Sequence, residues 1–338
     1  MKTYAGIDLH SSNSSIGILD EQDRRLFSKR LPNDLNKILT ALEPFRESLA
    51  AIVVESTYNW YWLVDGLMAA GYTVHLPNPS TIQQYEGLKQ ADDKWDSSWL
   101  AHMQRLGILP QGYIYPKAER PLRDLLHRRL LFVRQRTTLI LIFQTMVACV
   151  KGVKLSVQEI AKLVRPELEA LFVSEQMVLI AEEELAGIAA LSKSIKRMEQ
   201  AIRAELKLKP EFELLLTIPG VGFILAATIM LEVGDIHRFK KVGNYTSYCR
   251  CVGSRWSSND KTKGKGNTKN GNKYLAWAYV EAANFSKRFC PPAERYYQRK
   301  AAKTKNVVAI KALSHKLARA SYYIMRDGVV YDKNLLFR

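Results

Sequence analysis

The chain has 338 residues, of which 47% are hydrophobic and 25% charged, so it is long enough for two folded domains and too apolar for an intrinsically disordered protein. Its 50 Lys and Arg outnumber 33 Asp and Glu, and the formal net charge of +17 favours a polyanion such as nucleic acid as partner. The longest apolar run, 139–150, is shorter than the roughly 20 residues of a membrane span, and no secretory signal is visible, so we expect a cytoplasmic or nucleoid protein without a membrane partner.

The first part of the chain alternates between short apolar strands and helices. An antiparallel meander of three strands is expected at 4–10, 14–20 and 25–31. The following pattern predicts helix, strand, helix and strand at 33–49, 51–56, 59–71 and 72–78. Three strands followed by alternating helix and strand is the element order of the ribonuclease H-like fold, which we expect for residues 1–115.

Acidic residues stand at chosen places in this pattern. Asp8 lies in the first strand within GID, and Glu55 closes the fourth strand within VVES. Strands one and four are neighbours in the expected sheet, so these two acids should meet at one edge. The segment ADDKWDSSWLA (91–101) starts a helix with Asp93 and Asp96 three apart on a shared face. Alternatively, the aspartates of this segment cap the helix and complement its dipole.

Four converging carboxylates repel one another unless cations lie between them. A pair of Mg²⁺ ions, about 4 Å apart, would relieve that repulsion, activate a nucleophile and stabilise the leaving oxygen of a phosphodiester, with Mn²⁺ as an alternative ion. The other interpretation makes Asp8 a turn cap and Glu55 a partner of a backbone amide. An acid buried on a strand is unfavourable without a partner, which favours the metal site.

A GID sequence on a first strand also occurs in actin-like sugar kinases. Here LHSSNSS follows where a Gly-Thr turn would be expected, and no second Gly-rich phosphate loop appears later in the chain. The sequence therefore argues against a kinase.

The middle of the chain, 116–208, has little strand character. Two long helical patterns, 121–150 and 174–206, carry Leu, Ile, Val and Ala at seven- and eleven-residue spacings. Such spacings are typical of an antiparallel helical arm or coiled coil, which we expect to mediate oligomerisation.

The remainder, 209–338, is expected to be a mostly helical, basic domain. LLLTIPGVGFILAATIMLEVGD (214–235) has the pattern of a helix-hairpin-helix, in which Pro219 ends one helix and Gly220 and Gly222 allow a tight turn. Free amides at the next helix start would then face a nucleic-acid backbone. The alternative is an ordinary turn between two helices of a core.

The next segment, 251–271, is rich in Gly, Asn, Lys and Ser and precedes a clear helix at 272–283. We expect a loop that wraps a phosphate backbone, with Ser257 or Ser258 as a nucleophile whose attack on phosphorus needs nearby cations. As alternatives, both serines are solvated polar residues and the basic residues form a solvated face. The cations of the expected nucleic-acid surface are Arg255, Lys261, Lys263, Lys265, Lys269 and Lys273.

Taken in order, these motifs resemble a known family. GID, VVES, the DxxD of ADDKWDSSWLA, the LLLTIPGVG hairpin and the SS…KGN…KNGNKYL segment are similar to those of the DEDD transposases of insertion sequences, which include a pilin-gene invertase. The resemblance spans nearly the whole chain. It implies a Holliday-junction-resolvase-like N-terminal domain, a helical arm and a C-terminal transposase domain.

The same resemblance implies residue roles and partners. The acids fall on Asp8, Glu55, Asp93 and Asp96, and the nucleophilic serine falls on Ser258 when KNGNKYL is aligned and counted back. Strand exchange would proceed through a phosphoserine. A structured non-coding guide RNA would pair with donor and target DNA, and dimers would assemble into tetramers. We therefore expect a Mg²⁺-dependent, RNA-guided DNA transposase; the alternatives are a hydrolytic Holliday-junction-type nuclease and a non-catalytic nucleic-acid-binding protein.

Overall fold

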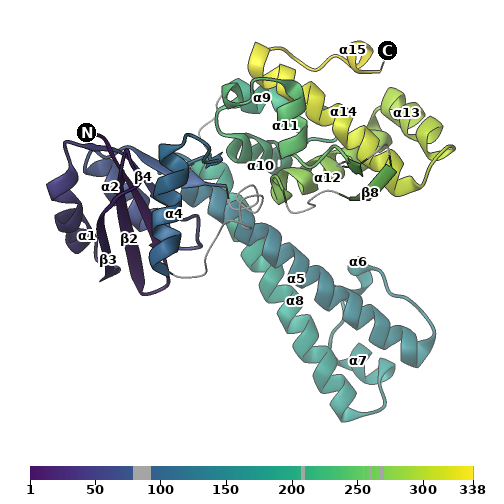
Figure 1. Ribbon diagram of the computed structural model, residues 1–338. Coiled ribbons are helices and arrows are strands. Elements are labelled where there is room, and N and C mark those ends of the chain that lie inside the picture. The colour runs from purple at the N-terminus through teal and green to yellow at the C-terminus, as the bar shows by residue number, and fades with distance from the viewer. Residues whose placement is uncertain (79–92, 207–209, 254, 259–260, 266–269, 338) are drawn as a thin grey trace. The chain divides into compact units, whose positions relative to one another are not determined.

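A computed structural model describes residues 1–78, 93–206, 210–253, 255–258, 261–265 and 270–337 (Figure 1). The chain divides into two compact units, Met1–Lys117 and Ala118–Arg338. The first unit contains a mixed sheet with helices, and the described part of the second is mostly helical, as expected. The further separation of an arm, 116–208, from a C-terminal domain, 209–338, stays a prediction.

The sheet of the first unit has the strand order β3-β2-β1-β4-β5-β6. β1 pairs with β2, and β2 with β3, in antiparallel register, while β1–β4 and β4–β5 are parallel. The expected antiparallel meander and the adjacency of the first and fourth strands are thus confirmed. A short antiparallel sixth strand was not expected. The strand bounds are Thr3–Leu9, Asn13–Asp20, Arg25–Pro32, Leu49–Val54, Val74–Pro77 and Gln111–Gly112.

Helices cover both faces of this sheet. α1 (Leu35–Leu42) and α2 (Tyr61–Ala69) pack on one face, and α4 (Asp93–Arg105) contacts the other. α1 is shorter than the expected helix at 33–49. It begins at the cap Asp34, and a 3₁₀ turn, Glu43–Phe45, takes over at Pro44, whose ring is incompatible with a helix interior.

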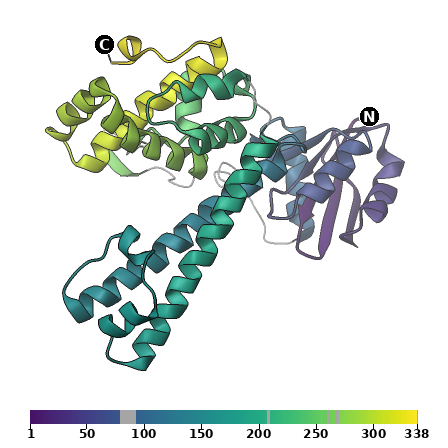
Figure 2. The ribbon, with the colours of Figure 1, turned by 180° about the vertical axis from the view of Figure 1, so that it is seen from behind.

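The second unit begins with two long helices, α5 (Arg120–Lys151) and α8 (Glu175–Glu205), which lie side by side (Figures 1 and 2). The short helices α6 (Val157–Ile160) and α7 (Arg165–Leu171) lie between them in sequence. Buried residues such as Phe143, Val147 and Ala181 join this pair. Knobs-into-holes packing, which defines a coiled coil, stays a prediction.

α5 is also, within the described ranges, long and apolar enough to cross a membrane by length and composition, with 28% of its most apolar window buried. This is weak support for a membrane span. Apolar residues of α5 are also buried within the protein, where Ile140, Phe143 and Val147 pack into one cluster with residues of α8.

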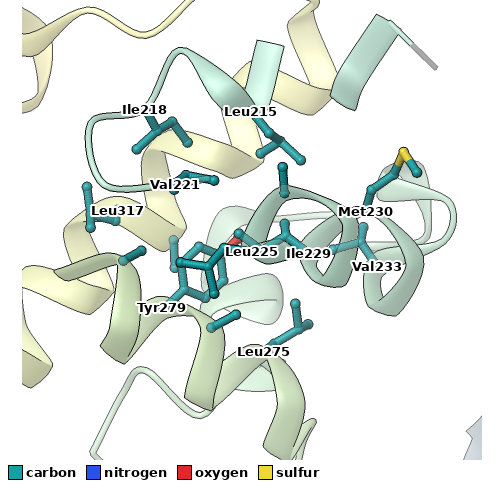
Figure 3. Close-up of a cluster of buried hydrophobic side chains, with 14 of the residues drawn as sticks. Leu215, Ile218, Val221, Leu225, Ile229, Met230, Val233, Leu275, Tyr279 and Leu317 are labelled. Atoms are coloured by element: carbon teal, nitrogen blue, oxygen red, sulfur yellow. The ribbon is translucent and has the colours of Figure 1, made fainter. Parts of the chain in front are cut away.

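A second core joins the helices of the C-terminal half (Figure 3). Leu225 and Ile229 pack with Leu275, Tyr279 and other buried side chains. Leu126 of α5 and Ile202 of α8 belong to the same core, so the two long helices are anchored in it. The helices are α9 (Pro210–Leu216), α10 (Phe223–Val233), η3 (Ile236–Arg238), α11 (Val242–Tyr248), α12 (Lys273–Phe289), α13 (Pro291–Ala301), α14 (Asn306–Asp327) and α15 (Lys333–Leu336).

The polar segment before α12 differs from the expected loop. β7 (Arg255–Ser258) and β8 (Lys261–Lys265) form a two-stranded antiparallel ribbon. Gly, Lys and Ser have low strand propensity, so the sequence pattern indicated a loop. Pairing of the two strands satisfies backbone hydrogen-bonding groups that a loop would leave to solvent. We call these two strands the serine ribbon.

Candidate active site and serine ribbon

Asp8 is a buried acid near the end of β1, with 4% of its surface exposed. Alternate residues of the strand, Ala5, Ile7 and Leu9, belong to the core shared with α1 and α2. Because side chains alternate between the faces of a strand, Asp8 lies on the opposite face, which α4 covers. Its Oδ2 is 3.1 Å from Nε2 of His10.

Glu55 follows β4 directly and lies beside Asp8. The amide of Glu55 donates a hydrogen bond of 2.9 Å to the carbonyl of Ile7, and Ile7 pairs with Val54 in the parallel register. The next position along that register sets Glu55 next to Asp8. Val53, which alternates with Val54, packs in the cluster around α4. Both acids therefore belong to the same face of the sheet, at the ends of neighbouring strands.

Two glycines allow α4 to approach this face closely. Gly6 and Gly17 pair across β1 and β2. A Cβ atom at Gly6 would lie only 1.9 Å from the carbonyl oxygen of Ser97, and one at Gly17 would lie 2.9 Å from the amide nitrogen of Ser98. Both contacts involve backbone atoms of the helix, which cannot rotate away. The glycine pair thus determines how near the helix lies to the strand that carries Asp8.

The direction of α4 follows from its C-terminal end. Asp23 accepts hydrogen bonds from Arg105, at 2.7 Å from Nε, and lies 2.8 Å from Nδ1 of His102. Asp23 stands in the turn after β2, and the last residue of β2, Asp20, pairs with Thr3 at the start of β1. The end of α4 therefore lies at the start of β1, and its first residues lie towards the other end, where Asp8 is.

These contacts also change the acidity of Asp23. Partial burial raises the pKa of this carboxyl, but the hydrogen bonds and positive charges of His102 and Arg105 outweigh burial and hold the pKa below its usual value. Asp23 is thus held in its charged form as the anchor of the helix.

The remaining two predicted acids belong to the start of α4. Asp96 is half-buried, and its Oδ1 atom is fully buried. Asp93 is the first residue of the helix, and its side chain lies outside the described residues. The direction of the helix sets its first turn towards the end of β1 that bears Asp8. The convergence of all four acids stays a prediction.

The loops after the two acid-bearing strands are tied together. The carbonyl of His10 accepts hydrogen bonds from the side-chain amides of Asn33, at 3.0 Å, and Asn59, at 3.1 Å. Asn59 comes shortly after Glu55, so one backbone oxygen connects the loop after β1 with the loop after β4. Sequence reasoning missed these asparagines, although Asn in a turn beside a strand end is a common signal for such backbone contacts.

The donor set is chemically suited to a divalent metal ion. Carboxylate oxygens are the ligands that Mg²⁺ and Mn²⁺ prefer, and two of the four predicted acids occupy adjacent positions with Asp8 buried. Among the side chains that the structure describes, no group of three His, Cys, Asp or Glu is close enough to hold an ion. The side chain of Asp93 is not among them.

The serine ribbon carries both candidate nucleophiles. Ser257 pairs with Thr262, and Ser258 pairs with Lys261. The predicted cations Arg255, Lys263 and Lys265 belong to the same two strands. Side chains of both serines and of these three cations lie outside the described residues, as does all of Lys269. Lys261 and Lys273, by contrast, are exposed.

A groove begins beside the chain that leads into β7. It has a volume of about 1150 Å³ and is lined by Cys251, Val252 and Gly253 on that side. Helices α12, α13 and α14 supply cations to it, namely Lys287, Lys300 and Lys311. The ammonium of Lys287 lies 4.6 Å from the ring centre of Tyr297, which also lines the groove.

The glycines of the expected helix-hairpin-helix have different surroundings. Gly220 has φ of +88°, and a Cβ there would lie 2.4 Å from the amide nitrogen of Ser286. Position 220 therefore needs glycine for two reasons, the positive φ of the turn and the close packing on α12. Gly222 is exposed and precedes α10 as its N-cap, with no atom within 4 Å of an added Cβ. Contact of either glycine with a nucleic-acid backbone stays a prediction.

Two family models match the chain. A DEDD transposase model of the IS110 type covers residues 5–148, and the model described as Transposase IS116/IS110/IS902 family covers residues 212–298. The first match contains the sheet from Ala5 onwards and all four predicted acids, and the second contains the serine ribbon.

Three curated proteins of insertion elements are similar to the chain. The chain is 26% identical over 151 residues to an uncharacterized protein of insertion element IS110 from Streptomyces coelicolor, a match covering 44% of this chain and 37% of that one. It is 20% identical over 286 residues to the transposase of IS1111A from Coxiella burnetii, covering 82% and 76%. A transposase of IS1328 from Yersinia enterocolitica is 27% identical over 148 residues, covering 42% and 44%.

Among solved structures, Thermus thermophilus RuvC in complex with a Holliday junction substrate matches 33% of this chain and 100% of its own, at 15% identity and a TM-score of 0.27. The fold of the first unit is defined by its own strand order, independently of that match. The two family models together cover most of the chain, and two of the three relatives are named transposases. The chain therefore belongs to the DEDD transposases of IS110-type insertion sequences.

Proposed function

We propose that the protein is a divalent-metal-dependent DNA transposase that exchanges strands through a phosphoserine. The observation that carries the proposal is the placement of Asp8 and Glu55 side by side on the face of the sheet that α4 covers. Asp8, Glu55, Asp93 and Asp96 would hold the metal, most simply two Mg²⁺ ions. Bound there, the metal would offset negative charge at the reacting phosphodiester.

The strand order supports a ribonuclease H-like, resolvase-like assignment for the first unit. Family membership implies a divalent-metal-dependent enzyme that acts on DNA. The protein's own contribution in this unit is a rigid platform. Sheet register fixes two of the carboxylates, and the ion pairs at Asp23 fix the helix that bears the other two.

The chemical step assigned to the second unit is a transesterification. Oγ of Ser258 attacks phosphorus, and its proton passes to a base or to solvent. One P–O bond of the DNA backbone breaks, and the displaced oxygen takes up a proton from solvent, so that the strand leaves as a hydroxyl. In the second step, a hydroxyl from another DNA strand attacks the phosphoserine and releases the serine. Each step exchanges one phosphodiester-type bond for another, so no ATP is needed.

Charge and groove chemistry support a nucleic-acid partner. The net charge of +17 and the cations Lys287, Lys300 and Lys311 suit a phosphate backbone, and the apolar lining with Tyr297 suits unpaired bases. We propose donor and target DNA as substrates and a structured non-coding RNA as guide. The chain would act in the cytoplasm as a dimer that assembles into a tetramer through the long helices.

The test is strand exchange on plasmids that carry the element's ends, with and without Mg²⁺. Asp8→Asn should abolish both cleavage and exchange, because the replacement keeps the size of the side chain and removes its charge. Glu47→Gln, an exposed acid of the same unit, is the matched control and should be fully active. Full exchange by the Asp8→Asn protein would contradict the assignment of the acid site.

The hydrolytic alternative differs in its products. A junction nuclease that uses water leaves free phosphate ends and no protein on the DNA. For the guide, nucleic acid copurified from cells should contain a discrete RNA encoded beside the gene. Recovery of only random cellular RNA would contradict RNA guidance without affecting the assignment of the acids.

A further inference from the structure

Glu232 is a charged residue buried in the apolar helix α10, with 1% of its surface exposed. Arg123 of α5 reaches both of its carboxylate oxygens, at 2.9 Å from Nε to Oε1 and 3.1 Å from Nη2 to Oε2. Nε2 of His127, one turn further along α5, also contacts Oε1. From the other side, the side-chain amide of Asn272 donates to Oε2. One carboxylate thus joins α5, α10 and the start of α12.

Buried ion pairs of this kind seldom increase stability beyond what apolar side chains of the same size would give, because desolvation opposes the Coulomb gain. Burial by itself raises the pKa of Glu232. The hydrogen bonds from His127 and Asn272 and the charge of Arg123 outweigh it and hold the pKa below its usual value. A carboxylate held ionised inside a core calls for a role other than packing, and its partners indicate which.

Asn272 stands where the polar segment with the serine ribbon ends and α12 begins. Its Oδ1 caps the helix by accepting from the amides of Tyr274 and Leu275, at 2.8 and 3.0 Å, which leaves Nδ2 to reach Glu232. The two functions of this side chain therefore use different atoms and can be separated by substitution.

The two ends of the serine-bearing segment are fastened to each other at this point. The amide of Asn272 donates to the carbonyl of Tyr248, at 2.6 Å, and Nε of Arg250 donates to the carbonyl of Gly271, at 3.0 Å. Gly271 has φ of +85°, and an added Cβ would lie 2.5 Å from the carbonyl oxygen of Tyr248. We call these four residues the clasp.

α5 touches the same place a second time. The ring of His127 stacks on that of Tyr274, in the first turn of α12, with centroids 3.5 Å apart and planes 6° from parallel. The first turns of α5 thus contact both Glu232 and the residues just after the clasp. α5 continues from there into the long helical pair.

We propose that Glu232 is a positioning residue, which joins α5 to the clasp through Asn272 and so fixes the base of the serine ribbon. This inference rests on the proposed role of the ribbon in strand exchange. Glu232 itself touches no substrate. Through it, the long helix α5 and the segment bearing the nucleophile move as one body, so that the serine is presented in a single position.

The mildest test is Asn272→Ser. Serine keeps a capping oxygen for α12 but cannot reach Glu232, while Arg123 and His127 keep their partner. Amide hydrogen exchange of β7 and β8 should become about tenfold faster, and strand exchange should slow by about 10- to 100-fold, the size of effect expected for a misplacement near 1 Å. Asp34→Ser, the same kind of change at the cap of α1, is the matched control and should alter neither.

A second test exchanges the donor and the acceptor of the hydrogen bond between positions 272 and 232. Asn272→Asp keeps the cap but sets a second carboxylate against Glu232, so both readouts should worsen beyond the effect of Asn272→Ser. Adding Glu232→Gln lets the new amide at position 232 donate to the new carboxylate at position 272. In the double variant, both the protection of the β7 and β8 amides and the rate of strand exchange should return at least to within about threefold of their values in the Asn272→Ser protein. Two substitutions that only damaged the fold would instead add their effects.

The outcomes separate this inference from the proposed function. If the β7 and β8 amides of the Asn272→Ser protein exchange hydrogen at the wild-type rate, the positioning role is overturned, whatever the strand-exchange activity. Faster amide hydrogen exchange together with an unchanged rate of DNA strand exchange would also overturn it, because the ribbon would then be loosened without any effect on activity. Absence of any phosphoserine in the wild-type protein would remove the proposed chemistry, while the amide exchange would still report whether the clasp is held through Glu232. If the double variant fails to fold, Asn272→Ser decides alone.

Discussion

The acid site and the serine ribbon are held in place by different means. In the first unit, Asp8 and Glu55 take their positions from strand register, and α4 is set against them by the glycine pair Gly6 and Gly17. In the second unit, the ribbon is a two-stranded element fastened at its base by side-chain hydrogen bonds and a buried carboxylate. The first arrangement depends on steric fit and on the exposed ion pairs of Asp23, whereas the second depends on a buried charge, so its stability should follow the ionisation of Glu232.

The largest effect should distinguish the two serines. Ser258→Ala should lower strand exchange by about 10³-fold or more because the nucleophile is lost, while Ser257→Ala should retain activity within about tenfold. Single-turnover assays on a plasmid substrate give both rates. The reverse pattern would assign the role of nucleophile to Ser257 and would still place it in the serine ribbon. Full activity of a protein with both Ser257→Ala and Ser258→Ala would show that the ribbon does not supply the nucleophile.

The charge dependence of the second unit can be measured as stability against pH. Glu232→Gln should lower the free energy of unfolding by roughly 3 kcal/mol at pH 7, because Arg123 and His127 lose their buried anion. The pKa of Glu232 is below its usual 4.5 in the folded protein, so its contribution is complete above that pH and is lost as the pH falls through the folded value.

Denaturant titrations of the wild-type and Glu232→Gln proteins at pH 7, 5 and below 4 follow this dependence. The difference between the two proteins should shrink as the pH falls from 5 to below 4, where Glu232 becomes protonated. A difference that grows between pH 5 and pH values below 4 would contradict the assigned ionisation.

The steric dependence of the first unit is tested at a glycine. Gly6→Ala should destabilise the protein by about 1–3 kcal/mol, because the added methyl meets a helix backbone atom at 1.9 Å. Cleavage should fall with it, since α4 carries two of the predicted ligands. Gly112→Ala is the control within the same unit, where an added Cβ has only ordinary contacts at 3.4 Å. Equal thermal unfolding of the two variants would contradict the close approach of the helix.

The smallest effect concerns the groove. Replacing Lys287, Lys300 and Lys311 by Gln should weaken binding of a single-stranded oligonucleotide by about tenfold. The slope of log K against the logarithm of the salt concentration should become less steep by about two. The exposed lysines Lys2, Lys29 and Lys37 of the other unit, changed together, provide the charge-matched control. Equal losses in both triple variants, measured by fluorescence anisotropy, would show that only net charge matters.

Much of the first unit could be predicted from the sequence, because its strands are short apolar runs bounded by turns. Asp8 interrupts one such run and Glu55 ends another, and the element order makes their strands neighbours, so their proximity followed from topology. The closeness of α4 did not follow, because Gly6 and Gly17 signal it only when the facing helix is known. The same holds for Asp23, which anchors a helix about 80 residues later in the chain.

The second unit was less predictable. The polar composition of 255–265 indicated a loop, yet cross-strand pairing makes it a ribbon. Glu232 did give a signal, since it is the one charge within FILAATIMLEV and a buried charge requires a partner. Its partners, however, stand 105 and 109 positions before it and 40 after it, a separation that no local pattern encodes.

The most direct measurement is the mass of the peptide that contains both serines. Digestion with trypsin releases WSSNDK, residues 256–261, from the wild-type protein trapped on a nicked suicide DNA substrate. We predict that this peptide carries a nucleotide on Ser258, and that the Asp8→Asn protein yields the bare peptide. Cleaved DNA with free phosphate ends and an unmodified peptide would contradict the account and establish hydrolysis instead.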